Sequence, residues 1–196
     1  MLLLPAYLLG TFPSAGLVGR WAGQDPTQAG SGNPGASNAY RTMGRRAGAL
    51  VLVGDVCKGA LAAGGGLVLG GRGIGVVCGL AAVVGHVLPA TRRFRGGKGV
   101  ATAAGMSAVL LPVPTLALAL LWALVAKVTA TASIASIVIA VAMPGAAAIA
   151  GRPPRELVAF GACGALVVMR HRSNIDRLRR GEERTLARGR LDADLP

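Results

Sequence analysis

The chain has 196 residues, of which 53% are hydrophobic and 15% charged, a balance that excludes a disordered chain and is too apolar for an ordinary soluble domain. Its formal net charge is +13, but the basic residues gather in short intervals, and the stretch 99–126 carries no charge. A soluble nucleic-acid-binding protein would spread its basic side chains over one face of a domain, so we expect no nucleic-acid partner.

The apolar segments predict a membrane protein, because the bilayer core leaves backbone polar groups to be satisfied within a helix. The first segment, 2–19, has no basic residue before it, and we expect it to remain in the mature chain as one span. A glycine-rich turn at Arg72 joins the next two apolar segments into a helical hairpin. Pro112 and Pro114 divide the long segment that follows into two helices. The remaining predicted spans are 47–71, 74–90, about 99–111 and 114–126, 131–150 and 156–169.

Seven spans place the two ends of the chain on opposite sides of the membrane, and the basic residues decide which end is cytoplasmic. With the N-terminus outside, the extracellular segments carry only three basic residues, Arg72, Arg152 and Arg155. The cytoplasmic segments then carry seventeen basic residues: Arg20, Arg41, Arg45, Arg46, Arg92, Arg93, Arg95, Lys98, Lys127 and the eight arginines from Arg170 to Arg190. We therefore predict an all-α polytopic helical bundle of about seven spans, forming a single domain over 1–196 with a polar tail at 184–196.

Cysteine usage gives no sign of a disulfide or a metal site. Cys57, Cys78 and Cys163 all fall in apolar segments, and the sequence contains neither a CxxC motif nor a Cys/His cluster. We expect these residues to be small buried hydrophobes, and we expect no metal and no cofactor.

Three loops on the predicted cytoplasmic side combine glycine, a cation and short polar side chains. The first, 30–41, has the composition of a simple turn, but its glycines and polar side chains could also form an anion-binding nest with Arg41 as the cation. The second, 92–102, places Lys98 among glycines at the start of a helix, an arrangement that favours a bound phosphate. It is not a P-loop, because Gly99 stands where that motif requires serine or threonine.

The third loop begins at Arg170, and His171 and Asn174 share a face if the last span continues helically through them. Asp55 and Lys58 are also three residues apart, within an otherwise apolar span, and intramembrane charges are costly enough to be functional or paired. We interpret them mainly as a structural pair, and secondly as residues that position the first loop. Phosphate-binding loops on one side of the membrane indicate a substrate with several phosphates, or two phosphorylated substrates.

Three segments, in this order and spacing, resemble the motifs of the bacterial acyl-phosphate-dependent glycerol-3-phosphate acyltransferase family: Ser31 to Asn38, Gly96 to Thr102 and Arg170 to Ile175. Segments 54–60 and 85–86 also resemble it, and the similarity extends to about Glu183. The resemblance implies an inner-membrane enzyme that transfers an acyl group from acyl phosphate to glycerol 3-phosphate, with its active site on the cytoplasmic face. Its products would be lysophosphatidic acid and phosphate, in the first step of phospholipid synthesis.

The resemblance also implies the site residues. His171, Asn174, Lys98 and Ser136 would be catalytic, with Ser133 as the alternative serine. The residues expected to bind substrate phosphate are Ser31, Gly32, Asn33, Gly35, Asn38, Arg41, Gly96, Gly97, Lys98, Gly99 and Gly181, the last followed by Glu182 or Glu183. We expect His171, oriented by Asn174, to be the general base, although a substrate phosphate oxygen could take the proton instead.

Two other functions stay open at this point. A small transporter for an anionic metabolite would also use intramembrane charges and broken helices, but the halves of the sequence show no internal repeat. Acyl transfer from acyl-CoA is the second alternative, and no adenine or pantetheine signature supports it. The expected partners are acyl phosphate, glycerol 3-phosphate and membrane lipids, without an obligatory protein partner. Acyl-chain preference, oligomeric state and the role of the tail have no signal in the sequence.

Overall fold

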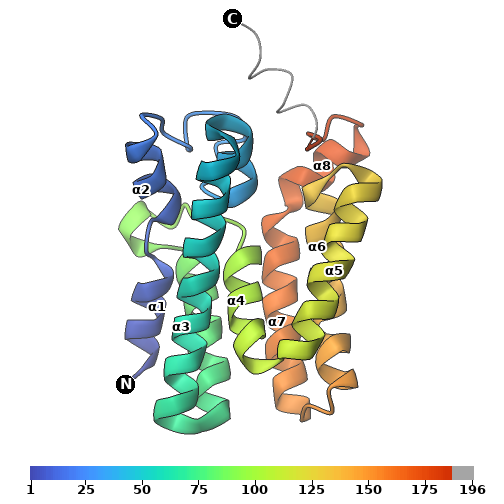
Figure 1. The fold of residues 1–196 in the computed structure, drawn as a ribbon. Coiled ribbons are helices and arrows are strands. Elements are labelled where there is room, and N and C mark those ends of the chain that lie inside the picture. The colour runs from blue at the N-terminus through green and yellow to red at the C-terminus, as the bar shows by residue number, and fades with distance from the viewer. Residues whose placement is uncertain (187–196) are drawn as a thin grey trace, which may run out of the picture.

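The computed structural model describes residues 1–186, and the helices within this range pack side by side as a bundle (Figure 1). The elements are α1 (Leu3–Gly10), α2 (Ser14–Trp21), α3 (Ala36–Val87), η1 (Ala90–Arg92), α4 (Val100–Leu110), α5 (Pro112–Thr129), α6 (Ala132–Ile149), α7 (Pro154–Arg170) and α8 (Arg172–Arg179). The predicted all-helical architecture is confirmed over these residues. Of the predicted tail, 184–196, the structure describes 184–186, and the residues from 187 on, including Arg188, Arg190, Asp192 and Asp194, lie outside the described range.

The longest element, α3, contains the predicted helical hairpin. Its backbone leaves helical geometry at Gly44 and again at Gly71, where φ is 77°, a value that glycine adopts without the steric cost of a Cβ. The chain reverses at Gly71, so the parts of α3 before and after it run antiparallel (Figure 1). The prediction of a turn at this point is confirmed.

The first predicted span is interrupted. The expectation of one helix over 2–19 is wrong, because α1 ends at Gly10 and α2 begins at Ser14. Pro13 precedes α2 and cannot donate a backbone hydrogen bond to continue α1. The break leaves the carbonyl of Phe12 available, and it accepts a hydrogen bond from Lys58 Nζ at 3.2 Å.

The proline pair divides the next apolar segment as predicted. Helix α4 ends at Leu110, and Pro112 occupies the first turn of α5, where its missing N–H costs nothing. Helices α6 and α7 match the last two predicted spans. By length and hydropathy, three segments of the described chain can cross a membrane: Ala36–Arg92, Pro112–Thr129 and Ala132–Ile149.

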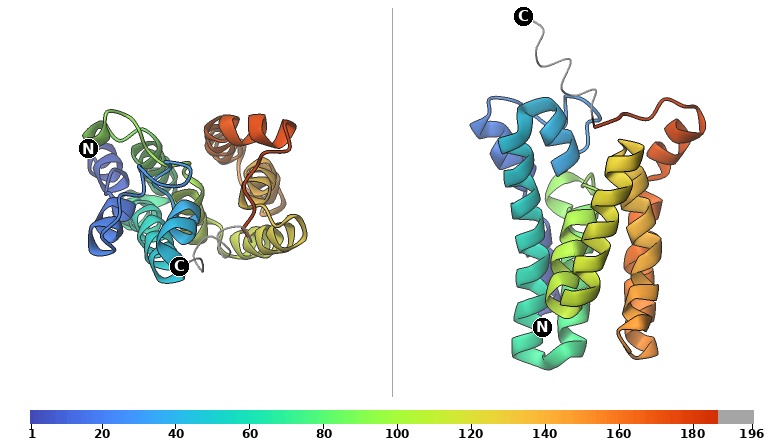
Figure 2. Two further views of the ribbon diagram at one scale, coloured as in Figure 1. Left: turned by 90° about the horizontal axis from the view of Figure 1, so that it is seen from above. Right: turned by 45° about the vertical axis from the view of Figure 1, so that its right-hand side comes forward.

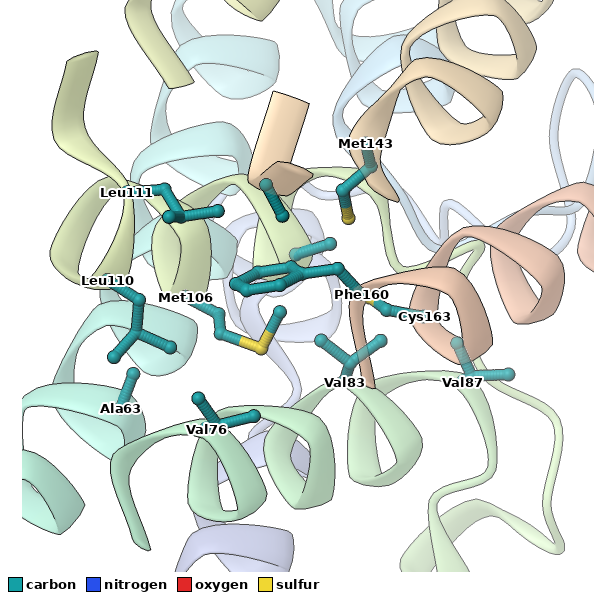
Figure 3. Close-up of a cluster of buried hydrophobic side chains, with 12 residues drawn as sticks. Ala63, Val76, Val83, Val87, Met106, Leu110, Leu111, Met143, Phe160 and Cys163 are labelled. Carbon is teal, nitrogen blue, oxygen red and sulfur yellow. The ribbon is translucent and has the colours of Figure 1, made fainter. Parts of the chain in front are cut away.

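Phe160 of α7 occupies the centre of the largest buried apolar cluster and is fully buried (Figure 3). Around it lie Met106 and Leu110 of α4, Met143 of α6, and valines of the second half of α3. This cluster therefore joins the first helices of the chain to the last ones.

Viewed from above, the helices form two groups, with α1, α2 and α3 on one side and α5, α6 and α7 on the other (Figure 2). At the end of the bundle where α3 reverses, Arg72 makes a two-pronged ion pair with the buried Glu156 of α7, and its Nη2 also donates to the Leu110 carbonyl at 2.8 Å. This end of the bundle is thus held together by charge and by the Phe160 cluster, and the opposite end carries the three predicted loops.

Candidate active site

A cavity of about 780 Å³ lies between the two groups of helices. The loops before α3 and α4 and the segment after α8 supply its polar end. Its remaining wall is apolar and comes from α3, α4, α5, α6 and α7: Leu52, Ala103, Ala104, Leu118, Ala119, Trp122, Ile139, Ala140, Met143 and Val167. The cavity therefore combines a polar end with a long apolar surface.

Asn38 organises the first loop. Its side-chain amide donates to the carbonyls of Pro26 and Ala29, and its Oδ1 accepts from both the backbone N–H and the hydroxyl of Ser31. The expectation that Asn38 donates to a phosphate is wrong for this geometry, because both of its N–H groups are already used inside the loop. Asn38 instead fixes Ser31 at the edge of the cavity.

The first turn of α3 opens onto the cavity beside Arg41. Gly35 is the N-cap of this helix, and within the described chain no side chain caps its free N–H groups. Gly35, Ala36 and Ser37 line the cavity together with Arg41. Among the described residues, the buried Nε of Arg41 has no hydrogen-bond partner. A helix N-terminus and an unpaired guanidinium therefore face the same space, an arrangement suited to an anion.

The second loop is held between two residues, His86 and Arg170, that were not predicted to contact it. The N–H of Gly97 donates to the carbonyl of His86 at 3.1 Å, and Arg170 donates to the carbonyls of Gly96 and Gly97. The expectation that Gly96 and Gly97 cradle a phosphate does not hold, because the Gly97 N–H is used and neither residue lines the cavity. These glycines are required by packing, since a Cβ at either would overlap His86.

Lys98 and Gly99 reach the cavity from this loop. Gly99 is the N-cap of α4 with φ of 87°, and Val100 and Ala101 follow it along the cavity wall. Lys98 Nζ donates to Asn174 Oδ1 at 2.5 Å. Burial, together with the neighbouring arginines and against the opposing charge of Glu183, lowers the pKa of Lys98 from an ordinary value of 10.5 to about 8.

The third loop brings Asn174 and Glu183 together. Glu183 Oε1 accepts hydrogen bonds from Asn174 Nδ2 at 2.5 Å and from Ser133 Oγ at 2.9 Å, and its Oε2 pairs with Arg177 at 2.8 Å. Burial alone would raise the pKa of Glu183, but these hydrogen bonds and the guanidinium lower it, so the carboxylate stays charged. The sequence motif predicted an acidic residue after Gly181 but did not distinguish Glu183 from Glu182.

His171 lies at the junction of α7 and α8, buried beside Lys98. Its Nδ1 is 2.8 Å from the carbonyl of Val167, which therefore orients the ring; the expectation that Asn174 does so is wrong, because both ends of the Asn174 amide are engaged elsewhere. Burial and the Lys98 cation lower the pKa of His171 to about 4. At neutral pH the ring is uncharged, and donation from Nδ1 leaves Nε2 with a lone pair.

The two candidate serines of α6 both line the cavity but have different partners. Ser133 donates to Glu183, whereas Ser136 donates to the Ala132 carbonyl and accepts from Trp122 Nε1. Of the other predicted residues, Ser31, Asn33, Gly35, Asn38, Arg41, Lys98, Gly99, His171 and Asn174 line the cavity, whereas Gly32 and Gly181 do not. Gly181 follows α8 in the turn that returns the chain to Glu183.

The polar end of the cavity has an excess of positive charge. Arg41, Arg45, Lys98 and Arg184 line it together with two carboxylates. Both carboxylates already have cationic partners, since Asp55 pairs with Lys58 and Glu183 with Arg177. The cavity is therefore suited to a ligand with an anionic head and an apolar tail.

Comparison with known proteins agrees with this chemistry. A family model described as glycerol-3-phosphate acyltransferase matches residues 1–181. Relatives named glycerol-3-phosphate acyltransferase include one from Pseudomonas paraeruginosa, 44% identical over 94% of this chain and 97% of its own length, and one from Rubrobacter xylanophilus, 42% identical over 94% and 93%. The fold also matches crystal structures of PlsY (YgiH), an integral membrane glycerol 3-phosphate acyltransferase. They are 35% identical, cover 94% of this chain and 93% of theirs, and give TM-scores of 0.90 for the glycerol 3-phosphate form and 0.86 for the lysophosphatidic acid form.

Proposed function

The chain belongs to the glycerol-3-phosphate acyltransferase family, and we propose that it moves a fatty acyl group from acyl phosphate to the sn-1 hydroxyl of glycerol 3-phosphate. The products are lysophosphatidic acid and inorganic phosphate, and the reaction begins phospholipid synthesis. The relatives are acyltransferases, so the transporter alternative has no support from them.

The observation that carries this proposal is the composition of the cavity. Its cationic end receives the N-termini of both α3 and α4, with Arg41 beside one and Lys98 on the loop before the other. Two phosphorylated substrates need two such anion sites, and a fatty acyl chain needs the apolar wall beyond them. A volume of about 780 Å³ falls in the range of small-molecule sites, roughly 300–1,000 Å³.

Acyl phosphate is a mixed anhydride, so the acyl group needs no prior transfer to the enzyme. The glycerol hydroxyl attacks the acyl carbon, the C–O bond to phosphate breaks, and phosphate leaves with the bonding electrons. Arg41 and Lys98 neutralise the two phosphates, and free N–H groups at the helix N-termini stabilise the oxyanion of the tetrahedral intermediate. The hydroxyl proton passes to Nε2 of His171 or to a substrate phosphate oxygen.

The remaining residues of the network hold these groups in place. Asn174 fixes the Lys98 ammonium, and Glu183 in turn fixes Asn174 and Ser133. We assign Ser133 the position next to Glu183, and Ser136 the wall next to Trp122. Ser31 and Asn33 complete the first anion site, and Gly35 and Gly99 are the N-caps of the two helices that begin at the cavity.

Hydropathy and charge support an inner-membrane location with seven crossings. In this arrangement the interrupted α1–α2 segment counts as one crossing, the N-terminus lies outside, and the cavity mouth and C-terminus are cytoplasmic. Glycerol 3-phosphate would then reach the site from the cytoplasm and the acyl chain from the bilayer.

Lysophosphatidate formation by detergent-purified protein tests the proposal. Glycerol 3-phosphate is supplied with either palmitoyl phosphate or palmitoyl-CoA, and Lys98→Ala is compared with Lys127→Ala, which removes an exposed lysine at the end of α5. We expect product from acyl phosphate only, lost in Lys98→Ala and retained in Lys127→Ala. Equal product from palmitoyl-CoA, or no product from folded protein, contradicts the proposal.

A further inference from the structure

Three buried ionisable side chains lie beside the second loop, and two of them, Asp55 and His86, also line the cavity. The mechanism above gives none of the three a role. Asp55, Lys58 and His86 are only 2%, 3% and 3% exposed. Asp55 Oδ1 is 2.9 Å from Lys58 Nζ and 3.6 Å from His86 Nδ1. We propose that this Asp55–Lys58–His86 cluster positions the Lys98 loop for phosphate binding, an inference that rests on the proposed function of the cavity.

The cluster connects three segments of the fold. Asp55 and Lys58 belong to the first half of the α3 hairpin and His86 to the second. Lys58 also donates to the carbonyl of Phe12, in the break between α1 and α2. The ion pair therefore ties the first half of α3 to the break between α1 and α2, and it holds the Asp55 carboxylate beside His86 Nδ1, which has no hydrogen-bond partner within the described chain.

His86 contacts the second loop directly, through both its backbone and its ring. Its carbonyl accepts the N–H of Gly97, and its Nε2 packs so closely on Gly97 that a Cβ there would overlap it. From the other side, Arg170 binds the carbonyls of Gly96 and Gly97. The two residues before Lys98 are thus clamped between His86 and Arg170, and the direction of the Lys98 side chain depends on both.

The ring of His86 is arranged to support the loop and not to act on substrate. An aspartate next to a histidine nitrogen is also the arrangement of a general base, but then the other ring nitrogen must face the substrate. Here that nitrogen, Nε2, faces the backbone of Gly97. His86 is accordingly a positioning residue that acts through Lys98.

The test compares affinity for glycerol 3-phosphate, measured by isothermal titration calorimetry, with thermal stability. The variants are Asp55→Asn and His86→Gln, and the matched control is Glu156→Gln, which weakens the Arg72 pair at the far end of the bundle. We expect the two cluster variants to bind about tenfold more weakly and to raise KM by the same factor. Glu156→Gln should lower the melting temperature and leave affinity unchanged.

Folded cluster variants that bind glycerol 3-phosphate within twofold of the unvaried protein would overturn the proposal. If they do not fold, Gly97→Ala decides, because its methyl group meets His86 Nε2 while the cluster stays intact. We expect it to weaken binding about tenfold, and His86→Ala added to it should recover part of the loss. Unchanged affinity in Gly97→Ala overturns the proposal.

A failure of the proposed function is distinguishable from a failure of this inference. If the unvaried protein makes no lysophosphatidate, the assigned reaction is wrong, but the same variants can be titrated with inorganic phosphate. Phosphate affinity that falls in the cluster variants and stays constant in Glu156→Gln supports the positioning role whatever the reaction is. Phosphate affinity that stays constant in all of them overturns it.

Discussion

The rate of acylation should depend on pH through the ammonium group of Lys98. With its pKa lowered to about 8, this amine is charged below pH 8 and neutral above it. Only the charged form neutralises a phosphate, so kcat/KM for glycerol 3-phosphate should fall as pH rises through 8. The decline should approach tenfold for each further pH unit, since kcat/KM reports the ionisation of the free enzyme.

The magnitude follows from the change in pKa between the unfolded and folded chain. Lowering the pKa from 10.5 to about 8 disfavours the charged form by about 3 kcal/mol. Between these two values the unfolded chain binds more protons than the folded one, so this group makes the fold more stable as pH rises. Below pH 8 the full cost is present, and Lys98→Met should therefore raise the free energy of unfolding at pH 7, by up to about 3 kcal/mol, while abolishing activity.

Initial rates between pH 6.5 and 9.5, with glycerol 3-phosphate varied and non-enzymatic acyl phosphate hydrolysis subtracted, provide the measurement. Lys98→Arg is the control, because a guanidinium stays charged over this range. We expect a lower rate but no alkaline decline in that variant. A flat profile in the unvaried protein, or the same decline in Lys98→Arg, would refute the reasoning.

Three further substitutions have defined outcomes. Asn38→Ala removes four hydrogen bonds from the first loop, so it should lower the free energy of unfolding by roughly 1–3 kcal/mol and raise KM; an unchanged KM in steady-state kinetics would contradict the role given to this loop. Phe160→Ala should cost about 3–5 kcal/mol in denaturant unfolding, against little change for the exposed Met169→Ala. His171→Gln should lower kcat by roughly 10²–10⁴ if the ring accepts the proton, whereas near-normal turnover with an unchanged pH profile assigns that task to a substrate phosphate.

Local signals were sufficient for most of the fold. The hairpin turn at Gly71 and the division at Pro112 both follow from residues that interrupt an apolar run, and hydropathy predicted α6 and α7. The break between α1 and α2 was missed because hydropathy continues through it without a charge. Pro13 was the available signal for this break, because a proline cannot donate the backbone hydrogen bond that continues a helix.

The residues of the site were easier to predict than their partners. Arg41, Lys98, His171 and Asn174 belong to polar motifs beside apolar spans, so their types and positions indicated phosphate chemistry. Several side chains around the site are held by hydrogen bonds to backbone carbonyls. Arg170, for example, binds the carbonyls of Gly96 and Gly97, more than seventy positions earlier. No pattern of residue types encodes such a contact, because any residue supplies a carbonyl and only the tertiary fold brings it near.

Helix α5 has a consequence for how enzymes of this kind can diverge. Only Ala126 of its eighteen residues is buried, although Leu118 and Trp122 line the apolar wall of the cavity. Both are half-buried, and only Trp122 of the two makes a side-chain hydrogen bond, to Ser136. Substitutions away from the core and from hydrogen-bond networks usually change the free energy of unfolding by no more than about 0.5 kcal/mol, which applies to Leu118 better than to Trp122. The α5 side of the wall facing the acyl chain can therefore vary at little risk to folding, and tolerance for different fatty acids can evolve there separately from the phosphate-binding loops.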